Sequence, residues 1–136
     1  MKSASAPPVR SIDHVHVYVS DRAAAELWYG KVLGFTRTTK LESWAEGAGP
    51  LTIQNAEATV HLALFERPAR KCRSTIALAV GAREFVAWKR HLSQALGREP
   101  EFEDHDLSVS LYFEDPYGNP YEITTYEHES ARLGLK

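Results

Sequence analysis

The stretch IDHVHVYVSD at residues 12–21 decides how the first half of the chain folds. Three valines alternate in it with polar or aromatic residues, namely Val15, Val17 and Val19 against His14, His16 and Tyr18. A period of two predicts a β-strand with one aliphatic face and one polar face. Asp21 then supplies helix N-cap chemistry, and the amphipathic spacing of residues 22–32 predicts a helix that ends at Gly34.

Working outward from this strand and helix, the pattern predicts a β-α-β-β-β unit followed by a second one. In the first unit, strands are expected at residues 12–19, 35–42, 51–54 and 58–65. In the second, the pattern predicts a helix at residues 83–96 and strands at 75–80, 101–103, 107–113 and 121–126. His14 and Thr75 are 61 residues apart, as are His61 and Glu122, and this shared offset favours an internal duplication.

The pattern therefore predicts one α+β domain over residues 1–136. Two paired βαβββ modules are expected to form a concave mixed sheet with the helices on its outer face. We expect the first module at about residues 11–66, a basic linker at 67–73, the second module at about 74–126 and a short charged peripheral tail at 127–136.

Composition excludes several classes of protein. The 136 residues carry a net charge of −2, with 43% hydrophobic and 25% charged residues, which is typical of an ordinary globule and not of a disordered chain. The basic residues form no run of the kind that binds nucleic acid, and no apolar run approaches the roughly 18 residues of a membrane span. Cys72 has no partner for a disulfide, which fits a reducing compartment, so we predict a cytoplasmic protein. The near-neutral charge fits a small-molecule ligand better than a polymer.

The polar strand face is where chemistry is expected. If the faces away from the helices join into one concave sheet, four equivalent positions converge: His14, His61, Thr75 and Glu122. Two histidines and a carboxylate match the facial-triad type of divalent-metal site, which leaves open positions for a substrate. The alternative is that each is a hydrogen-bonded strand residue or a rim charge. His16 lies on the same face and competes for the ligand role, and we expect it to line the site.

Five segments of the chain resemble the vicinal oxygen chelate superfamily, which groups glyoxalase I, fosfomycin- and bleomycin-resistance proteins and extradiol dioxygenases. These segments are IDHVHVYVSD, LWYGKVLGF, HLALF, TIALAV and SLYFEDPYGNPYEITTY. The resemblance runs from about residue 11 to residue 126, and its strongest part is the D-P-x-G-N-x-x-E run at residues 115–122. The family fold is the paired βαβββ architecture, with a metal in the concave sheet.

The resemblance implies a metal site at specific positions. His14 matches the first-strand histidine ligand, Glu122 matches the last-strand glutamate ligand, and His61 falls where glyoxalase-like members place a glutamate. Thr75 is the main departure, because it stands where most metal-binding members have a second histidine. Two hypotheses remain. One is an enzyme with Fe, Mn, Zn or Ni held by His14, His61 and Glu122, acting as a dioxygenase or as a lyase or isomerase. The other is a metal-free, drug-sequestering protein of the bleomycin-resistance type.

Further residues are expected to act on the substrate. Candidates for substrate binding are His16, Tyr18, Trp44, Phe65, Thr75, Tyr112, Thr124 and Tyr126. The aromatic wall would consist of Tyr18, Phe65, Tyr112 and Tyr126, with Trp44 on a nearby loop. For each of these aromatic residues the alternative is packing in the core. His105, in an acidic loop, is a candidate acid/base group beside Glu122, and its alternative is a solvated loop residue. The resemblance also implies a homodimer, and the linker at residues 67–73 is long enough for the modules to be exchanged between chains or not. If they are exchanged, His14 and His61 would come from one chain and Glu122 from the other.

Overall fold

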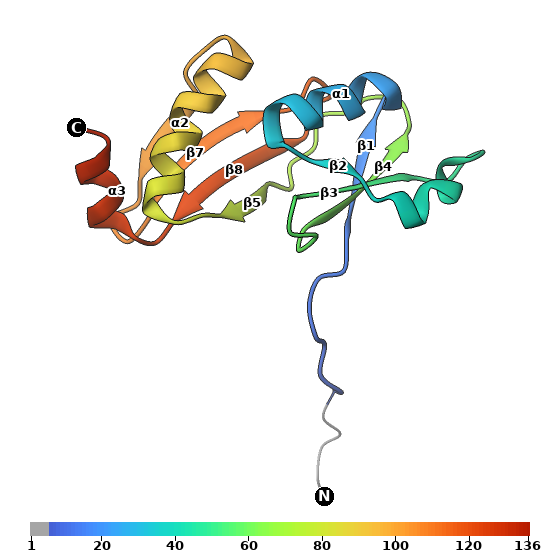
Figure 1. The fold of residues 1–136 in the computed structure, drawn as a ribbon, viewed down its shortest axis with the longest axis horizontal. Helices are drawn as coiled ribbons and strands as arrows, with labels where there is room; N and C mark the ends of the chain where they lie inside the picture. Colours follow the sequence, from blue (N-terminus) through green and yellow to red (C-terminus); the bar gives the residue numbers. More distant parts are fainter. Residues whose placement is uncertain (1–5) are drawn as a thin grey trace, which may run out of the picture.

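The structure of the chain is a computed structural model that describes residues 6–136, so residues 1–5 of the predicted domain lie outside it. Its elements follow the predicted order, with two short helices added (Figure 1). They are β1 (Val15–Val19), α1 (Arg22–Leu33), β2 (Thr36–Arg37), the 3-10 helix η1 (Thr39–Ala45), β3 (Leu51–Gln54), β4 (His61–Glu66), β5 (Ile76–Ala79), α2 (Ala82–Leu96), β6 (Glu101–Asp104), β7 (Val109–Glu114), β8 (Pro120–Thr125) and α3 (His128–Gly134).

The strands form two mixed sheets of four strands each. Their orders are β1-β4-β3-β2 and β5-β8-β7-β6, so the two sheets have the same topology. β1 runs parallel to β4 in the first sheet, and β5 runs parallel to β8 in the second. The other pairs are antiparallel. Figure 1 shows the sheets side by side, with α1 against the first and α2 against the second. The predicted α+β architecture of two βαβββ modules is confirmed.

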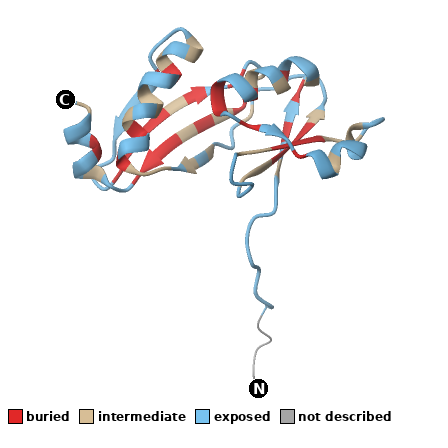
Figure 2. Ribbon diagram, in the orientation of Figure 1, coloured by how far each residue is buried: buried red, intermediate tan, exposed pale blue. Residues whose placement is uncertain are grey.

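Strand alternation explains where the core lies. Val17 and Val19 of β1 point toward the helix and are buried, as are Leu62 and Leu64 of the paired strand β4. The second module repeats this pattern with Leu111 and its neighbours packed beneath α2. Figure 2 shows the buried positions gathered on the strands and on the helix sides that meet them. The opposite face of each sheet is left for polar and aromatic side chains.

A buried hydrogen-bonded cluster joins the two modules of one chain. The Tyr29 hydroxyl on α1 donates to Oδ2 of Asp115 at 2.6 Å, and the Tyr121 hydroxyl on β8 lies 2.7 Å from that of Tyr29. Asp115 is only 5% exposed, and its carboxylate also accepts from the side-chain amide of Asn119 at 2.7 Å. The same amide donates to the backbone carbonyl of Tyr18 at 3.0 Å. The turn between β7 and β8 therefore connects the second module to both α1 and β1.

Two segments differ from the sequence-based expectation. The strand predicted at residues 35–42 is wrong beyond Arg37, because the chain turns after Thr38 and forms η1. The backbone N–H of Leu41 donates to the carbonyl of Thr38 at 3.0 Å, which starts this helix. The tail predicted as peripheral contains α3, which packs against α2 and buries Ala131 completely.

Candidate functional site

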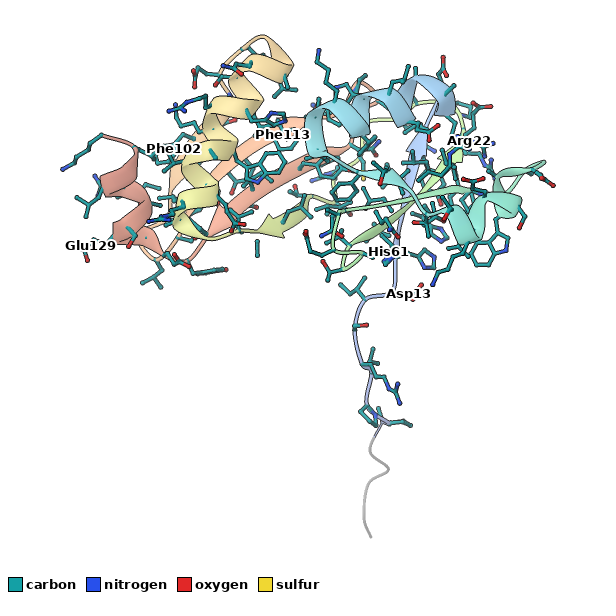
Figure 3. All side chains as sticks on the ribbon, in the orientation of Figure 1. Asp13, Arg22, His61, Phe102, Phe113 and Glu129 are labelled. Carbon is teal, nitrogen blue, oxygen red and sulfur yellow. The ribbon has the colours of Figure 1, made fainter. Side chains whose placement is uncertain are left out.

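Three histidines lie on the face of the first sheet that points away from α1. His14 immediately precedes β1, His16 lies on it, and His61 opens the parallel partner strand β4. The pairing of Val15 with Leu62 places His14 beside His61 and His16 beside Ala63. Figure 3 shows His61 close to Asp13, at the point where the chain enters β1.

His14 is held by hydrogen bonds on both ring nitrogens. Its Nδ1–H donates to Oδ2 of Asp13 at 2.7 Å, and this bond lowers the pKa of the Asp13 carboxyl below its ordinary value. Because a carboxylate only accepts, the proton of neutral His14 resides on Nδ1, and Nε2 carries a lone pair. Nε2 of His16 lies 3.1 Å from that nitrogen, and the two rings are stacked with centroids 5.0 Å apart. The lone pair of His14 is thus aimed at its neighbour on the same sheet face.

A pocket of about 320 Å³ opens beside His14 and His61. Its other walls come largely from η1 and β3, and the lining residues are Asp13, Thr38, Lys40, Leu41, Trp44, Pro50, Thr52 and Ala63. Trp44 is 56% exposed and lies on η1, so this predicted binding residue does line the pocket. The sequence predicted a strand where η1 begins, and for that reason Leu41 was missed.

Arg22 fixes the loop that forms the outer wall of this pocket. Its guanidinium donates to the carbonyls of Gly49 at 2.6 Å and Ala45 at 2.7 Å. Its backbone N–H donates to the carboxylate of Glu66 at 2.9 Å, which ties the start of α1 to the end of β4. Figure 3 shows Arg22 near the start of α1, where these bonds are made. The first helix therefore holds the segment that carries Trp44.

The second sheet presents a carboxylate on its corresponding face. Glu122 of β8 accepts a hydrogen bond of 2.6 Å from the hydroxyl of Ser110 on β7. The Ser110 hydroxyl also lies 3.0 Å from that of Thr124. Thr124, which was predicted to bind substrate, is 8% exposed. Sequence reasoning missed Ser110, although its alternation with Tyr112 along the strand is the signal that could have placed it on this face.

His105 and Tyr112 form a pair next to Glu122. Nε2 of His105 lies 3.0 Å from the Tyr112 hydroxyl, and the rings meet edge to face. Partial burial raises the pKa of Tyr112, and the negative charge of Glu122 raises it further. The His105 loop therefore folds back onto the strand that carries Tyr112, where a proton can be held between a ring nitrogen and a phenol oxygen.

The predicted site residues are divided between the two sheets. Phe65 lies 4.6 Å from His16 and 5.9 Å from Tyr18, ring centre to ring centre, so these aromatics cluster on the first sheet. Thr75 precedes β5 and is exposed, and Tyr126 follows β8 and is 76% exposed. Among residues 6–136, no three His, Cys, Asp or Glu side chains are grouped closely enough to hold a metal ion together. Within one chain, His14 and His61 lie on the first sheet and Glu122 lies on the second, so these three residues do not form one site.

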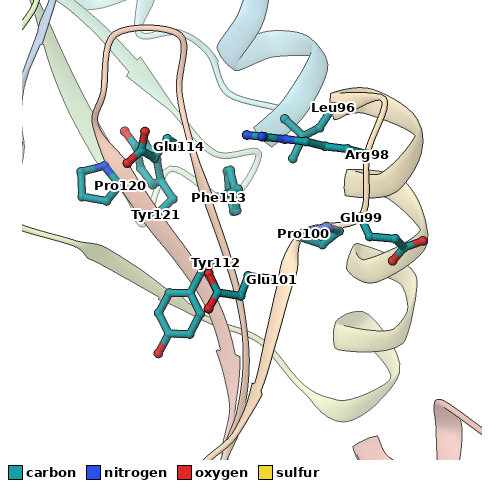
Figure 4. Close-up of a pocket in the computed structure, with 10 residues that line it drawn as sticks. All are labelled: Leu96, Arg98, Glu99, Pro100, Glu101, Tyr112, Phe113, Glu114, Pro120 and Tyr121. Atoms are coloured by element: carbon teal, nitrogen blue, oxygen red, sulfur yellow. The ribbon is translucent and has the colours of Figure 1, made fainter. Parts of the chain in front are cut away.

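A second pocket, of about 450 Å³, lies in the second module and was not predicted. Figure 4 shows its lining residues, which are Leu96, Arg98, Glu99, Pro100, Glu101, Tyr112, Phe113, Glu114, Pro120 and Tyr121. Tyr112 is the only predicted site residue among them. The charged groups that line this pocket have both signs, and Glu122 and Thr124 do not line it.

No helix within the described residues is long and apolar enough to cross a membrane.

Comparisons with known proteins agree on the fold. The family model described as Glyoxalase/Bleomycin resistance protein/Dioxygenase superfamily matches residues 11–123. A mutant of the fosfomycin resistance protein FosX from Listeria monocytogenes, complexed with Mn(II) and 1S,2S-dihydroxypropylphosphonic acid, is 14% identical, with a TM-score of 0.67 over 91% of this chain and 96% of that one.

Two further solved structures are similar. A glyoxalase family protein from Bacillus anthracis is 20% identical, with a TM-score of 0.66 over 90% of this chain and 99% of that one. A glyoxalase/dioxygenase from Nostoc punctiforme is 20% identical, with a TM-score of 0.68 over 93% and 98%. The search of curated proteins found no match. At these identities the solved structures establish the fold alone.

Proposed function

The chain belongs to the Glyoxalase/Bleomycin resistance protein/Dioxygenase superfamily, and from that premise we propose that it is a divalent-metal-dependent enzyme. Its substrate is a small, oxygen-rich organic molecule, and its reaction is of the dioxygenase or the lyase and isomerase type. The metal, which is Fe, Mn, Zn or Ni, is held by His14, His61 and Glu122. One observation carries this proposal. Asp13 holds the proton of His14 on Nδ1, which leaves Nε2 of His14 as an electron-pair donor beside a pocket that His61 also lines.

The donor set fits a divalent ion. Imidazole nitrogens with a carboxylate suit Zn, Fe, Mn and Ni. Metal-binding histidines ordinarily donate their second ring N–H to a carboxylate or carbonyl, as His14 donates to Asp13. The hydroxyl of Ser110 orients Glu122 in the same manner. When bound, the ion supplies Lewis-acid polarisation of adjacent substrate oxygens. FosX, a fold neighbour, holds Mn(II) together with a small dihydroxy phosphonate, which supports this assignment.

The site is completed by a second copy of the chain. β1 ends the first sheet and β5 ends the second, so each sheet has an edge strand that is free to pair with another chain. In a two-fold dimer, β1 of one copy lies beside β5 of the other. That arrangement brings Glu122 of one chain to His14 and His61 of its partner copy, and it builds two equivalent sites.

The protein's own groups bind the substrate and handle its proton. Trp44 and Leu41 exclude water from one side of the pocket, while Tyr18 and Phe65 extend the aromatic wall. On the other sheet, His105 is the group that takes or returns a substrate proton, and the Tyr112 hydroxyl, 3.0 Å from its Nε2, keeps its own proton and orients the imidazole. The remaining substrate contacts come from Thr75 and Tyr126, which are exposed, and Thr124 supports them from below through its contact with Ser110.

Metal analysis tests this proposal. Protein purified without chelators is measured for bound metal, and the apoprotein is titrated with Fe(II), Mn(II), Zn(II) and Ni(II). We expect stoichiometric binding of at least one of these ions in the wild type and its loss in His14→Ala and Glu122→Ala. Absence of binding of all four at millimolar concentration would sink the enzyme hypothesis.

A metal-free binding protein is the second candidate. It is favoured by the apolar walls of the pocket, which include Leu41, Trp44 and Pro50, and by threonine rather than histidine at position 75. On this hypothesis the cavity sequesters a flat organic ligand. Quenching of tryptophan fluorescence by such ligands in chelator-treated protein, lost in Trp44→Phe, is the result expected of a sequestering protein.

A further inference from the structure

We propose that the pocket beside His14 and His61 binds a small organic carboxylate, and that Lys40 and Thr52 hold its negative group. This inference deepens the proposed function by naming the class of substrate, and it rests on that function in taking this pocket as the substrate site. Lys40 and Thr52 both belong to the first module, so one chain supplies them without a metal or a second copy.

The side chain of Thr52 points into the pocket from the sheet. Thr52 lies on β3 directly opposite Ala63 of β4, and opposite residues of an antiparallel pair share one face of the sheet. Ala63 is two residues from His61 on the same strand, so it shares the face of that histidine. Thr52 is only 5% exposed, and it lines the pocket together with His61.

The hydroxyl of Thr52 is free to bond a ligand. Thr52 accepts through its backbone carbonyl from the N–H of Thr38 at 2.8 Å, and the Thr38 hydroxyl donates to Oε1 of Gln54 at 2.9 Å. The Thr52 hydroxyl itself has no protein partner within residues 6–136. Every fully buried side-chain N or O atom in this part of the chain does have one, so Oγ1 of Thr52 is open to the pocket that it lines. A hydroxyl in this position donates to an acceptor that enters the pocket.

Lys40 supplies the positive charge. It lies on η1, is exposed and lines the same pocket. Within the part of the chain that the structure describes, no carboxylate pairs with its ammonium. Asp13 is the acidic residue of the lining, and its carboxylate accepts from His14. Among the carboxylates and ammonium groups of the lining, the uncommitted charge is therefore positive.

The remaining walls suit an apolar body of limited size. Leu41, Trp44 and Pro50 are apolar lining residues, and the volume of about 320 Å³ is at the lower end of the range for small-molecule sites. One ammonium balances the single charge of a carboxylate, whereas a phosphate monoester carries up to two charges. The pocket therefore suits a small aromatic or aliphatic carboxylate.

The alternative is that Thr52 is only a strand residue and Lys40 only a solvated charge. The two roles differ in what each side chain does to a charged ligand compared with a neutral one of the same shape. A residue that holds the carboxylate affects the charged ligand more, whereas a residue that only shapes the fold affects both alike. The test therefore compares two such ligands.

The experiment titrates chelator-treated, full-length protein with benzoate and with benzamide, which have nearly the same shape and differ in charge. Binding is followed by the NMR signals of the backbone amides and of the Trp44 indole N–H, which is assigned by its loss in Trp44→Phe. The variants are Lys40→Met and Thr52→Val, which keep the stem and the shape of the side chain. Their matched controls are Lys31→Met and Thr39→Val, which replace exposed residues outside the pocket lining.

We expect the wild type to bind benzoate at least about 10-fold more tightly than benzamide, with a shift of the Trp44 signal. Lys40→Met should weaken benzoate binding by about 3–10-fold, because the ammonium is exposed. Thr52→Val should weaken it by about 10-fold, because a hydrogen bond to a carboxylate is charge-assisted. Benzamide affinity should change less in both variants, the controls should match the wild type, and Thr52→Ser should restore benzoate binding.

The inference is refuted if benzoate binds no more tightly than benzamide, if neither binds at millimolar concentration, or if the Trp44 signal does not shift. It is also refuted if either Lys40→Met or Thr52→Val leaves the benzoate affinity unchanged. Circular dichroism checks folding, and Thr52→Ala replaces the valine variant if that variant does not fold.

Metal analysis keeps this inference distinct from the proposed function. Protein that binds a divalent ion but gives any of the refuting results retains the proposed function and loses only the carboxylate site. Protein that binds benzoate as expected but none of the four ions loses the metal-dependent function, and the carboxylate site stands.

Discussion

Replacing Tyr29 by phenylalanine should weaken the joint between the two modules. The change deletes the hydroxyl that donates to Asp115 at 2.6 Å and that bonds to Tyr121 at 2.7 Å. Both partners remain buried, with Asp115 at 5% and Tyr121 at 0% exposure, so water does not replace the lost bonds. A hydrogen bond to a charged group contributes about 1.5–3 kcal/mol, and Asp115 retains its bonds to Asn119. We therefore expect a loss of about 2–4 kcal/mol in the free energy of unfolding.

This loss is large enough to measure. At about 2.1 cal/mol/K of unfolding entropy per residue, a chain of 136 residues should show a drop in Tm of about 7–14 °C. Urea unfolding followed by circular dichroism, at one fixed protein concentration because a dimer is expected, gives the free energy directly. Tyr126→Phe is the matched control, since it removes the same atom from a side chain that is 76% exposed. If both variants lose less than about 0.5 kcal/mol, the buried cluster does not stabilise the fold and the reasoning is refuted.

Three other perturbations have defined outcomes. Burial raises the pKa of Tyr29 and of Tyr121 above the ordinary value of 10.0, so the folded state retains these protons more tightly than the unfolded state does. Their contribution to stability is therefore complete below about pH 10 and declines as the pH rises above it, and phenolate absorbance should show both ionising only as the chain unfolds. In Gly49→Ala the new Cβ would overlap the backbone carbonyl of Trp44, so we expect a loss of about 1–3 kcal/mol and a shifted tryptophan emission; unchanged urea unfolding and emission would contradict this. Glu127→Ala removes the carboxylate that accepts from the first residue of α2 at 3.1 Å, and urea unfolding should show a loss of about 0.5–2 kcal/mol, whereas a neutral result would mean that this cap is unimportant.

The regular elements could be predicted from sequence because their signals are local. The alternation around Val17 gave the first strand, and the helix that ends at Gly34 was placed to within one residue. Gly34 has a φ of 72°, the left-handed conformation typical of a glycine that ends a helix. These features depend on the period of the side chains and on backbone sterics, and neither requires knowledge of distant contacts.

The missed features depend on tertiary contacts. Residues 39–45 continue directly from the short strand β2, and what distinguishes them is tertiary: Arg22 binds the carbonyl of Ala45, the last residue of the 3-10 helix, and that of Gly49 beyond it. Asp115 lies between the strands predicted at residues 107–113 and 121–126, and its burial beneath Tyr29 follows from packing between the modules. Ser110 supports Glu122 through a cross-strand bond of 2.6 Å that depends on strand register.

The candidate site was predicted in parts. His14 and His61 line one pocket, as the strand faces indicated. Glu122 lies on the other sheet of the same chain, so the expected convergence of the four positions does not occur within one molecule. Whether the two faces meet depends on how two copies pair, and hydrophobic periodicity carries no information about that pairing.

The central claim is that one metal site takes His14 from one chain and Glu122 from another. Co-expression of differently tagged His14→Ala and Glu122→Ala chains, followed by metal analysis, tests it most directly. Each variant alone should bind no metal, whereas random pairing makes about half of the dimers mixed, and each mixed dimer holds one intact site. We predict about one quarter of the wild-type metal content, found only in the doubly tagged fraction. Wild-type protein that binds metal while the mixed dimer binds none would contradict the shared site.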